Sequence, residues 1–244
     1  MMHNRITASI LILVTGLVFA PALLSQNAGV FPGTWQALTQ GQFLNDPKER
    51  AKGFAFTEEP PPMLPWALEK FETNRDPIKE RNDHGRMERD PGMNCYPPGP
   101  TWLHSQPRPF EFIEVPGRIF IRYEWDRSLR EIWMDGREHP KDMDPTWMGH
   151  STGKWDGDVL VVDTVGVTEK TWLDMAGHVH SDELHIVERF WRRDPETLVV
   201  DITFDDPVAY SRPWTGQRIF KLRPWEVQEH VACESHLIHE HKLQ

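Results

Sequence analysis

The second half of the chain is a series of short β-type runs, and this pattern limits the fold more than any other feature. After Pro109, runs rich in β-branched and aromatic residues recur about every ten residues. Pairs such as Asp-Gly and Pro-Gly separate them and favour tight turns. No helical pattern lies between the runs, which excludes an alternating α/β fold. The runs are FEFIEV, RIFIRYEW, LREIWMD, WMGHSTGKW, DVLVVDTV, ELHIVERFWRR, TLVVDITF, QRIFKL and VQEHVAC.

These runs predict an all-β fold, an antiparallel meander over residues 110–235. Closure into a barrel removes the exposed sheet edges. Polar residues lie beside apolar ones in some runs, as Arg122 and Glu124 do beside Ile121 and Tyr123, and this pattern suits a small barrel with a few polar groups inside. Gly33 and Trp35 also form a Gly-x-Trp motif that resembles the start of lipocalins. We therefore predict a lipocalin-like β-barrel, with a two-sheet sandwich as the main alternative.

The region before the β-type runs is rich in proline and has few regular elements. The prolines cluster in EEPPPMLPW, CYPPGPTW and SQPRP. One short helix is predicted over residues 65–74, PWALEKFETN, because proline is favoured in the first helical turn. Tryptophan and phenylalanine give the region apolar anchors that a disordered segment lacks. We predict that residues 27–109 form a wrap packed on the barrel and that residues 236–244 form a C-terminal tail.

The N-terminus has the pattern of a secretory signal peptide. Arg5 precedes an apolar run over residues 8–20, which ends in the small residues Ala20-Pro21-Ala22. The run is shorter than the roughly 20 residues that span a bilayer. We expect residues 1–26 to be removed and the mature protein to be periplasmic or secreted by a bacterium, with no membrane anchor.

The charge and the cysteine content of the chain limit the partners, cofactors and disulfides that can be expected. Lys and Arg number 27 and Asp and Glu 37, giving a formal net charge of −10. Nucleic acid is an unsuitable partner for such a chain. No phosphate-binding glycine loop is present, so we expect no nucleotide cofactor. A secreted protein can form disulfides, and we predict one between Cys95 and Cys233; two separate buried thiols are the alternative.

The segment GHVHSDELH, residues 177–185, gathers three histidines beside acidic residues. His178 and His180 are two residues apart, so in an extended segment both side chains point the same way. His150, in WMGHS, lies near the end of a neighbouring predicted strand, and Glu183 adds a carboxylate. These four residues are a candidate site for zinc or another late transition metal.

Two other interpretations of the histidines stay open. His150 or His178 can move protons without a metal if a carboxylate orients the ring and tunes its pKa. The carboxylates in reach of that role are Asp163, Asp174 and Glu188. Alternatively the imidazoles are structural and bond to backbone carbonyls in an ordinary loop. His185 is available as a further group in the metal site or in the metal-free acid/base set.

Asp163 is a separate candidate because it interrupts the apolar run DVLVVDTV. A carboxylate in such a strand must be paired or functional, since its burial without a partner is costly. Its candidate partners are Arg122, Arg130 and Arg189. A catalytic set therefore consists of His150, His178, Asp163 and Glu188.

The block from MDGREHP to LHIVERF, residues 134–190, resembles the signature of a family of secreted, largely uncharacterised bacterial proteins. The motifs are DGRxHP, DPTWMGHSxGxWxGDxLVVDTxG and WLDxxGHxHS, and the resemblance spans roughly residues 60–235. It implies membership alone and carries over no activity. Val167 departs from the family pattern, which has phenylalanine there.

Two classes of function follow from these features. The first is an enzyme, a lyase, isomerase or hydrolase, that acts on a small apolar or aromatic molecule through the histidine cluster, with or without a metal. Tryptophans, of which the chain has 11, would line its cavity. The second is a non-catalytic, lipocalin-like binder or carrier of a hydrophobic molecule, in which the histidines are structural. The clustering of ionisable residues favours the enzyme.

Overall fold

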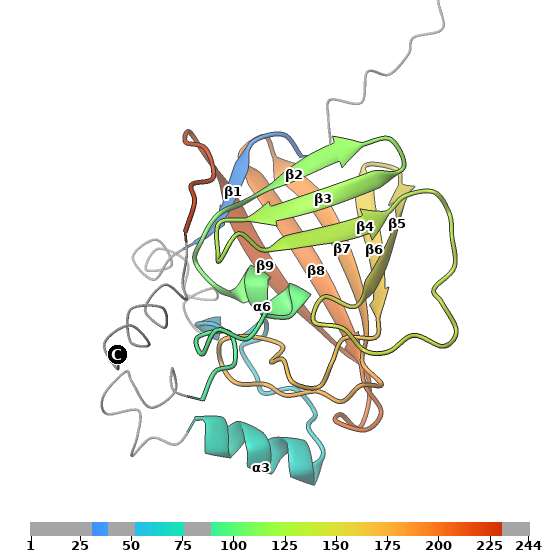
Figure 1. Cartoon of the computed structure of the whole chain (residues 1–244). Coiled ribbons are helices and arrows are strands. Elements are labelled where there is room, and N and C mark those ends of the chain that lie inside the picture. Colours follow the sequence, from blue (N-terminus) through green and yellow to red (C-terminus); the bar gives the residue numbers. More distant parts are fainter. Residues whose placement is uncertain (1–30, 39–51, 76–88, 231–244) are drawn as a thin grey trace, which may run out of the picture.

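The computed structural model describes residues 31–38, 52–75 and 89–230, and these form a closed β-barrel (Figure 1). The nine strands follow one another around the barrel in sequence order, and the last pairs with the first. The prediction of an all-β barrel is confirmed. The strands are β1 (Thr34–Ala37), β2 (Phe110–Val115), β3 (Arg118–Tyr123), β4 (Leu129–Trp133), β5 (His150–Asp156), β6 (Val159–Val165), β7 (His185–Asp194), β8 (Thr197–Asp205) and β9 (Trp214–Arg223).

Two features of the barrel differ from the predicted meander. Strand β1 lies in the region expected to be wrap, yet it closes the barrel by pairing with both β2 and β9. Its four residues are too few to show a strand pattern in the sequence, so the pairing partners decide its conformation. Strands β4 and β5 are parallel. Residues 134–149 connect them by a long excursion outside the barrel instead of a hairpin (Figure 1).

The Gly-x-Trp motif fixes β1 in place. Trp35 is fully buried, and its indole Nε1 donates to the carbonyl of Phe31 at 2.8 Å. The Arg192 guanidinium lies 5.3 Å from the centre of the indole ring. Gly33 has a φ of 102°, in the left-handed region that favours glycine, and a Cβ there would meet Leu222 at 2.5 Å. Both residues of the motif are therefore required by the local backbone and packing.

Two helices accompany the barrel in the described residues. Helix α3 (Pro65–Asn74) has the bounds predicted from the sequence. Helix α6 (Pro100–Ser105) was not predicted, because its PPGPTW sequence resembles the proline-rich wrap. It has only six residues, all buried, and a helix of that length is unstable alone. Packing against one end of the barrel therefore stabilises α6 (Figure 1).

A buried ion pair lies among the inward-facing residues of the barrel. Arg130 of β4 pairs with Glu188 of β7, and both side chains are fully buried. The Arg130 Nη1 donates to Glu188 Oε1 at 3.0 Å, while Ser151 and Thr164 accept from Nε and Nη2 at 3.2 and 2.9 Å. His104 of α6 adds its Nε2, 3.1 Å from Glu188 Oε1. Every charge in this network has hydrogen-bonding partners, as buried charges require.

Burial and the ion pair act on the Glu188 carboxylate in opposite directions. Burial raises its pKa, but Arg130 and the hydrogen bond with His104 outweigh burial and bring the pKa down to about 2. Burial lowers the pKa of His104 despite the neighbouring carboxylate. Glu188 is therefore ionised at any physiological pH, which suits a structural ion pair better than acid/base catalysis.

Aromatic rings fill the rest of the barrel centre around His104. Their centroids lie 5.5 to 5.8 Å from the imidazole centroid. The rings belong to Phe110, Tyr123, Phe190 and Phe220. The imidazole thus occupies the place where a lipocalin-like barrel would hold a ligand.

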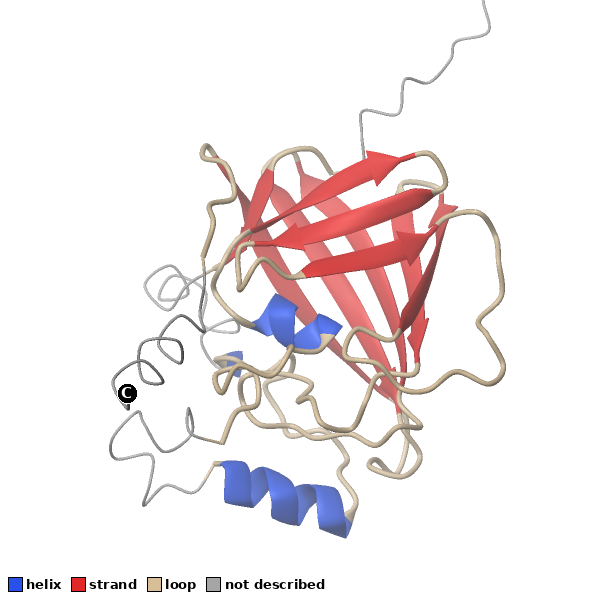
Figure 2. Cartoon of the chain, viewed as in Figure 1, coloured by secondary structure: helices blue, strands red, loops and turns tan. Residues whose placement is uncertain are grey.

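The loops gather at the end of the barrel that α6 enters, and α3 lies beyond them (Figure 2). Residues 224–230 form no strand where VQEHVAC predicts one; His230 makes an isolated bridge with Trp125. The remaining residues of that run, the expected signal peptide and the C-terminal tail lie outside the described residues. In the described ranges, no helix is long and apolar enough to cross a membrane.

The predicted disulfide is left open by the structure. Cys95 is not a free thiol, while Cys233 lies outside the described residues. We expect thiol titration of the denatured, unreduced protein to detect close to no free cysteine. Detection of both thiols would contradict the pairing.

The Arg130–Glu188 ion pair predicts a large effect of a nearly isosteric substitution. Glu188→Gln leaves the buried guanidinium without a countercharge and should lower the free energy of unfolding by about 3 to 5 kcal/mol in urea denaturation. Glu131→Gln is the control, since its pair with Arg118 is partly exposed and should contribute less than about 1 kcal/mol. Equal effects of the two substitutions would contradict the structural role.

The same pair predicts how stability depends on pH. The folded pKa of Glu188 is about 2, below the ordinary value of 4.5. A lowered carboxyl pKa contributes stability above the ordinary value, and that contribution is lost as the pH falls through the folded pKa. The difference between wild type and Glu188→Gln should therefore shrink between about pH 4.5 and pH 2.

Candidate functional site

The residues predicted to bind a metal do not form a common site. In the part of the chain that the structure describes, no group of three or more His, Cys, Asp or Glu side chains could hold a metal ion. His150 contacts His139, whereas His178 and His180 bond to separate partners within their own loop. Glu183 is exposed. The backbone between the two loop histidines is not an extended strand, so their two-residue spacing does not aim both rings at one point.

His150 belongs to a polar cluster on the outer wall of the barrel. Its Nδ1 lies 2.7 Å from Nδ1 of His139, which the β4–β5 connection brings over the strands. The Nε2 atoms of His139 and His185 lie 3.0 and 2.9 Å from Asp163 Oδ1. Asp163 is thus paired, but with histidines and not with an arginine. The three arginines considered for that role, Arg122, Arg130 and Arg189, pair with Glu111, Glu188 and Asp156.

The groups in this cluster shift one another's pKa values. The hydrogen bond that His185 donates to Asp163 raises the pKa of His185 and lowers the pKa of Asp163. Burial lowers the pKa of His150, and so does the neighbouring His139. Because the cluster joins the β4–β5 connection to β6 and β7, it attaches this long excursion to the barrel wall.

His180 fits the structural interpretation of the loop histidines. It is almost fully buried, its Nδ1 donates to the carbonyl of Ser181 at 2.9 Å, and its Nε2 lies 2.8 Å from Thr171 Oγ1. Burial lowers its pKa. With both nitrogens engaged, this imidazole has no atom left for a metal or a substrate.

His178 has a different environment, which is that of an oriented base. Its Nδ1 lies 2.7 Å from Oδ2 of Asp174, four residues earlier. The other carboxylate oxygen of Asp174 accepts the backbone N–H groups of residues 176, 177 and 178 at 3.0, 3.1 and 3.3 Å. Gly177 adopts the left-handed φ of 102° within this turn. The carboxylate is therefore fixed by the backbone and in turn fixes the imidazole.

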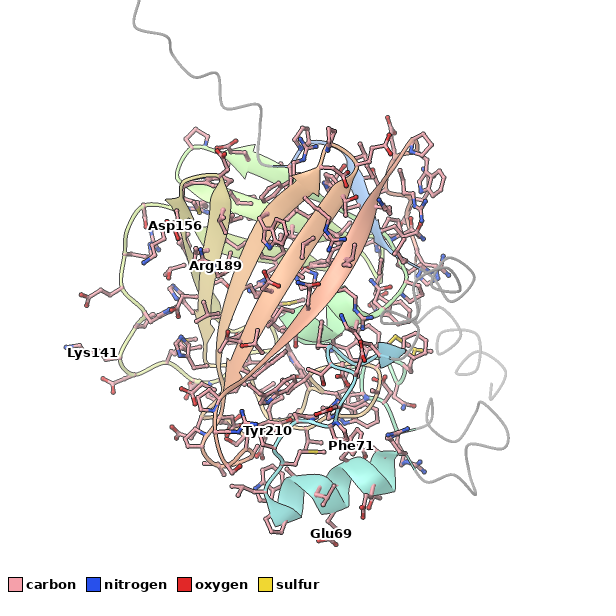
Figure 3. All side chains as sticks on the ribbon, turned by 180° about the vertical axis from the view of Figure 1, so that it is seen from behind. Glu69, Phe71, Lys141, Asp156, Arg189 and Tyr210 are labelled. Atoms are coloured by element: carbon pink, nitrogen blue, oxygen red, sulfur yellow. The ribbon has the colours of Figure 1, made fainter. Side chains whose placement is uncertain are left out.

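Aromatic side chains from distant parts of the sequence surround His178. Phe71 of α3 stacks on the imidazole with a centroid separation of 4.2 Å and an interplanar angle of 13°. Trp214 of β9 lies 6.3 Å from the imidazole centroid, and Tyr210 lies 5.4 Å from Trp214. Figure 3 shows Phe71 and Tyr210 at the same end of the molecule. The site lies between α3 and the barrel end.

Two buried polar atoms in this site have no hydrogen-bond partner within the described chain. They are Nε2 of His178 and Nε1 of Trp214. With Nδ1–H bonded to Asp174, His178 presents Nε2 as an acceptor, while the indole Nε1 is always a donor. Burial raises the pKa of the nearby Tyr210 well above its ordinary value, so this phenol stays neutral; its hydroxyl donates to the carbonyl of Val179 at 2.8 Å.

The sequence named some of this site and missed the rest. His178 is among the candidate catalytic residues, and Asp174 is among the carboxylates considered for orienting a ring. Phe71 and Trp214 were not anticipated, because an aromatic residue in a helix or strand is ordinarily a core residue and nothing local marks it otherwise. Their position beside His178 depends on tertiary contacts, since Phe71 belongs to α3 and Trp214 to β9.

Comparison with known proteins adds no assignment. No family model matches the chain, and no curated protein is significantly similar to it. The resemblance to a family of secreted bacterial proteins therefore stays a prediction.

The outer cluster predicts a pH-dependent coupling between Asp163 and His185. A raised histidine pKa contributes stability below its ordinary value of 6.5, and the contribution is lost as the pH rises through the folded pKa. A double-mutant cycle with Asp163→Asn and His185→Gln should give a coupling below about 1 kcal/mol at pH 5, because both groups are partly exposed. The coupling free energy should vanish at about pH 9, where His185 is neutral.

The exposed pair of Asp156 and Arg189 serves as the control for this cycle (Figure 3). This pair contains no histidine, so a cycle with Asp156→Asn and Arg189→Gln should give the same result at both pH values. An Asp163–His185 coupling that does not change with pH would contradict an ionised pair.

Proposed function

We propose that the protein is a secreted enzyme that uses His178 for acid/base chemistry on a small molecule, with Asp174 as the residue that orients the ring. One observation carries the proposal: a histidine bonded to a buried carboxylate through Nδ1 keeps Nε2 unpaired in an aromatic site. Such an arrangement selects the tautomer in which Nε2 accepts a proton. This is the metal-free interpretation of the histidine segment.

The unpaired atoms suggest what the substrate presents to the site. A hydroxyl group can donate to Nε2 of His178 and accept from Nε1 of Trp214, so it complements both atoms. The aromatic walls favour an apolar or aromatic body around that hydroxyl. Removal of a proton from such a group by Nε2 is a first step in eliminations, isomerisations and hydrolyses by an activated water. These are the lyase, isomerase and hydrolase classes expected from the sequence.

Helix α3 controls access to Nε2. Phe71 covers the imidazole, whose residue is only 3% exposed. The helix is tied near its ends, where Trp66 Nε1 donates to the carbonyl of Val208 at 2.6 Å and Asn74 Nδ2 donates to that of Gly177 at 2.9 Å. A substrate would therefore displace the Phe71 ring or shift α3, and closure afterwards would exclude water from the reaction.

The alternative function, a carrier with its ligand inside the barrel, has less support. Helix α6 enters the barrel end, and the His104 imidazole and four aromatic rings occupy the centre. A hydrophobic ligand would have to displace a residue bonded to the buried ion pair. Secretion to the periplasm or beyond is part of the proposal and rests on the N-terminal pattern alone.

Substitution of His178 tests the enzymatic role directly. Incubation with a library of small hydroxylated aromatic compounds, followed by mass spectrometry, should reveal turnover by the wild type. His178→Gln should lower kcat about 100-fold to 10,000-fold, the usual contribution of a general base. His185→Gln is the control, since it removes a histidine of the outer wall and should leave turnover unchanged. Undiminished turnover by His178→Gln would refute the proposal.

Asp174→Asn tests the orienting role separately. Nitrogen-15 NMR of the histidine ring should show a protonated Nδ1 and an unprotonated Nε2 in the wild type. An amide at position 174 can donate through its nitrogen, which would favour the opposite tautomer and remove the base. Turnover should then fall while His178 remains present. A wild-type ring with the proton on Nε2 would contradict the assignment.

A further inference from the structure

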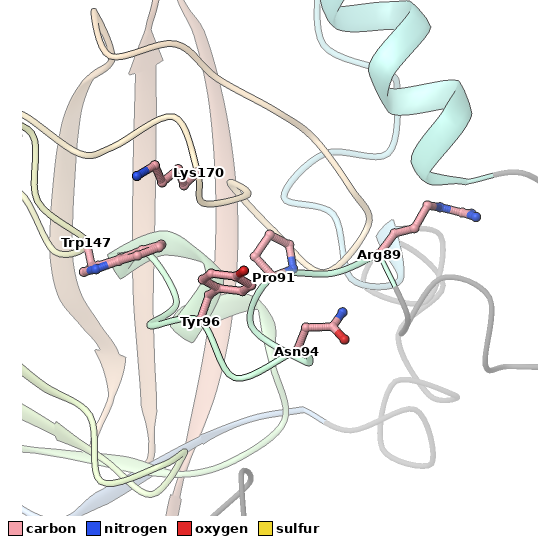
Figure 4. A pocket seen from close by; sticks show the side chains of 6 residues that line it. All are labelled: Arg89, Pro91, Asn94, Tyr96, Trp147 and Lys170. Carbon is pink, nitrogen blue, oxygen red and sulfur yellow. The ribbon is translucent and has the colours of Figure 1, made fainter. Parts of the chain in front are cut away.

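A second site is suggested by a surface pocket of about 730 Å³. Its volume is within the range of small-molecule sites. The pocket lies among the loops, and six side chains line it (Figure 4). They are Arg89, Pro91, Asn94, Tyr96, Trp147 and Lys170.

Two aromatic rings form the apolar part of this pocket. The Tyr96 and Trp147 centroids are 5.9 Å apart with an interplanar angle of 37°. Tyr96 is 56% exposed, so its ring is accessible to a ligand. Figure 4 shows the two rings next to each other, with Lys170 beside them. A flat apolar group can pack against such rings.

The charge of the pocket is positive, although the chain as a whole is acidic. Neither aspartate nor glutamate is among the six lining residues. Lys170 is exposed and makes no ion pair within the described part of the chain. The Arg89 guanidinium extends away from the rings and donates to the carbonyl of Asn74 at 3.0 Å (Figure 4). Lys170 is therefore the cation placed to meet a ligand on the aromatic pair.

The wall that carries Tyr96 is held by buried contacts. Asp90 is almost fully buried, and its carboxylate accepts from the indole Nε1 of Trp102 at 3.0 Å and from the backbone N–H of Gly92 at 2.9 Å. A Cβ at Gly92 would meet the Trp102 ring at 2.8 Å, so the loop packs closely on α6. A wall fixed in this way loses little conformational freedom when a ligand binds.

We propose that this pocket binds a small aromatic carboxylate, with the ring on Tyr96 and Trp147 and the carboxylate at Lys170. The class follows from the combination of flat apolar surfaces, one unpaired cation and no acidic group. The inference is independent of the proposed function, because it concerns binding at residues other than His178 and its neighbours.

Isothermal titration calorimetry of the mature protein with cinnamate tests the proposal. Saturable binding is expected, and cinnamamide, which lacks the charge, should bind roughly two- to fivefold more weakly, the contribution of an exposed ion pair. Lys170→Gln should weaken cinnamate binding by a similar factor and abolish the preference for cinnamate over the amide. Tyr96→Leu should weaken both ligands by about tenfold through loss of ring contact.

Controls separate this pocket from other sites. Lys154→Gln removes an exposed lysine of β5 and should leave cinnamate binding unchanged, as should His178→Gln. Weakening by His178→Gln would instead place the ligand in the candidate catalytic site. No saturable binding up to millimolar cinnamate, equal binding of cinnamamide, or tighter binding of the acidic sugar galacturonate would overturn the proposal. Tyr96 and Lys170 are exposed, so both variants should fold.

Discussion

The ion pair between Arg130 and Glu188 is the interaction on which the rest of the structure depends. Two charges inside a β-barrel have a large desolvation cost unless hydrogen bonds satisfy them completely. Ser151 and Thr164 contribute from the barrel wall, and His104 contributes from α6. The contact of His104 with Glu188 thus helps to hold α6, a helix too short to be stable alone, at the barrel end.

Helix α6 in turn holds the loop that carries the candidate site. Thr101 donates to the carbonyl of Leu173 at 2.7 Å, and the Ser105 hydroxyl oxygen accepts the backbone N–H of Met175 at 2.9 Å. These bonds lie on either side of Asp174, whose carboxylate orients His178. The wall of the aromatic pocket is tied to the same helix through Trp102. Both proposed sites are therefore built on an element whose position the buried charges determine.

The fold could be predicted from the sequence because strand periodicity and turn residues are local signals. Eight of the barrel strands fall in the runs that the sequence marked, and α3 has the predicted bounds. Local signals failed for β1, which depends on pairing with β2 and β9, and for α6, which depends on burial. They also failed for the parallel pairing of β4 with β5, because turn residues such as Asp135-Gly136 favour a hairpin and nothing local shows that the chain continues around the outside.

For the candidate site, the sequence by itself identified the candidate residues, and the tertiary structure decided which of them lie together. Asp174 and His178 are four residues apart in one turn, so their contact depends only on the local sequence. The separation of His150 from His178 and His180, and the pairing of Glu188 with Arg130, arise from the way strands arrange around the barrel. The Phe71 and Trp214 rings beside His178 come from segments on either side of it in the sequence. Packing alone unites them, because burial of apolar surface has no dependence on sequence distance.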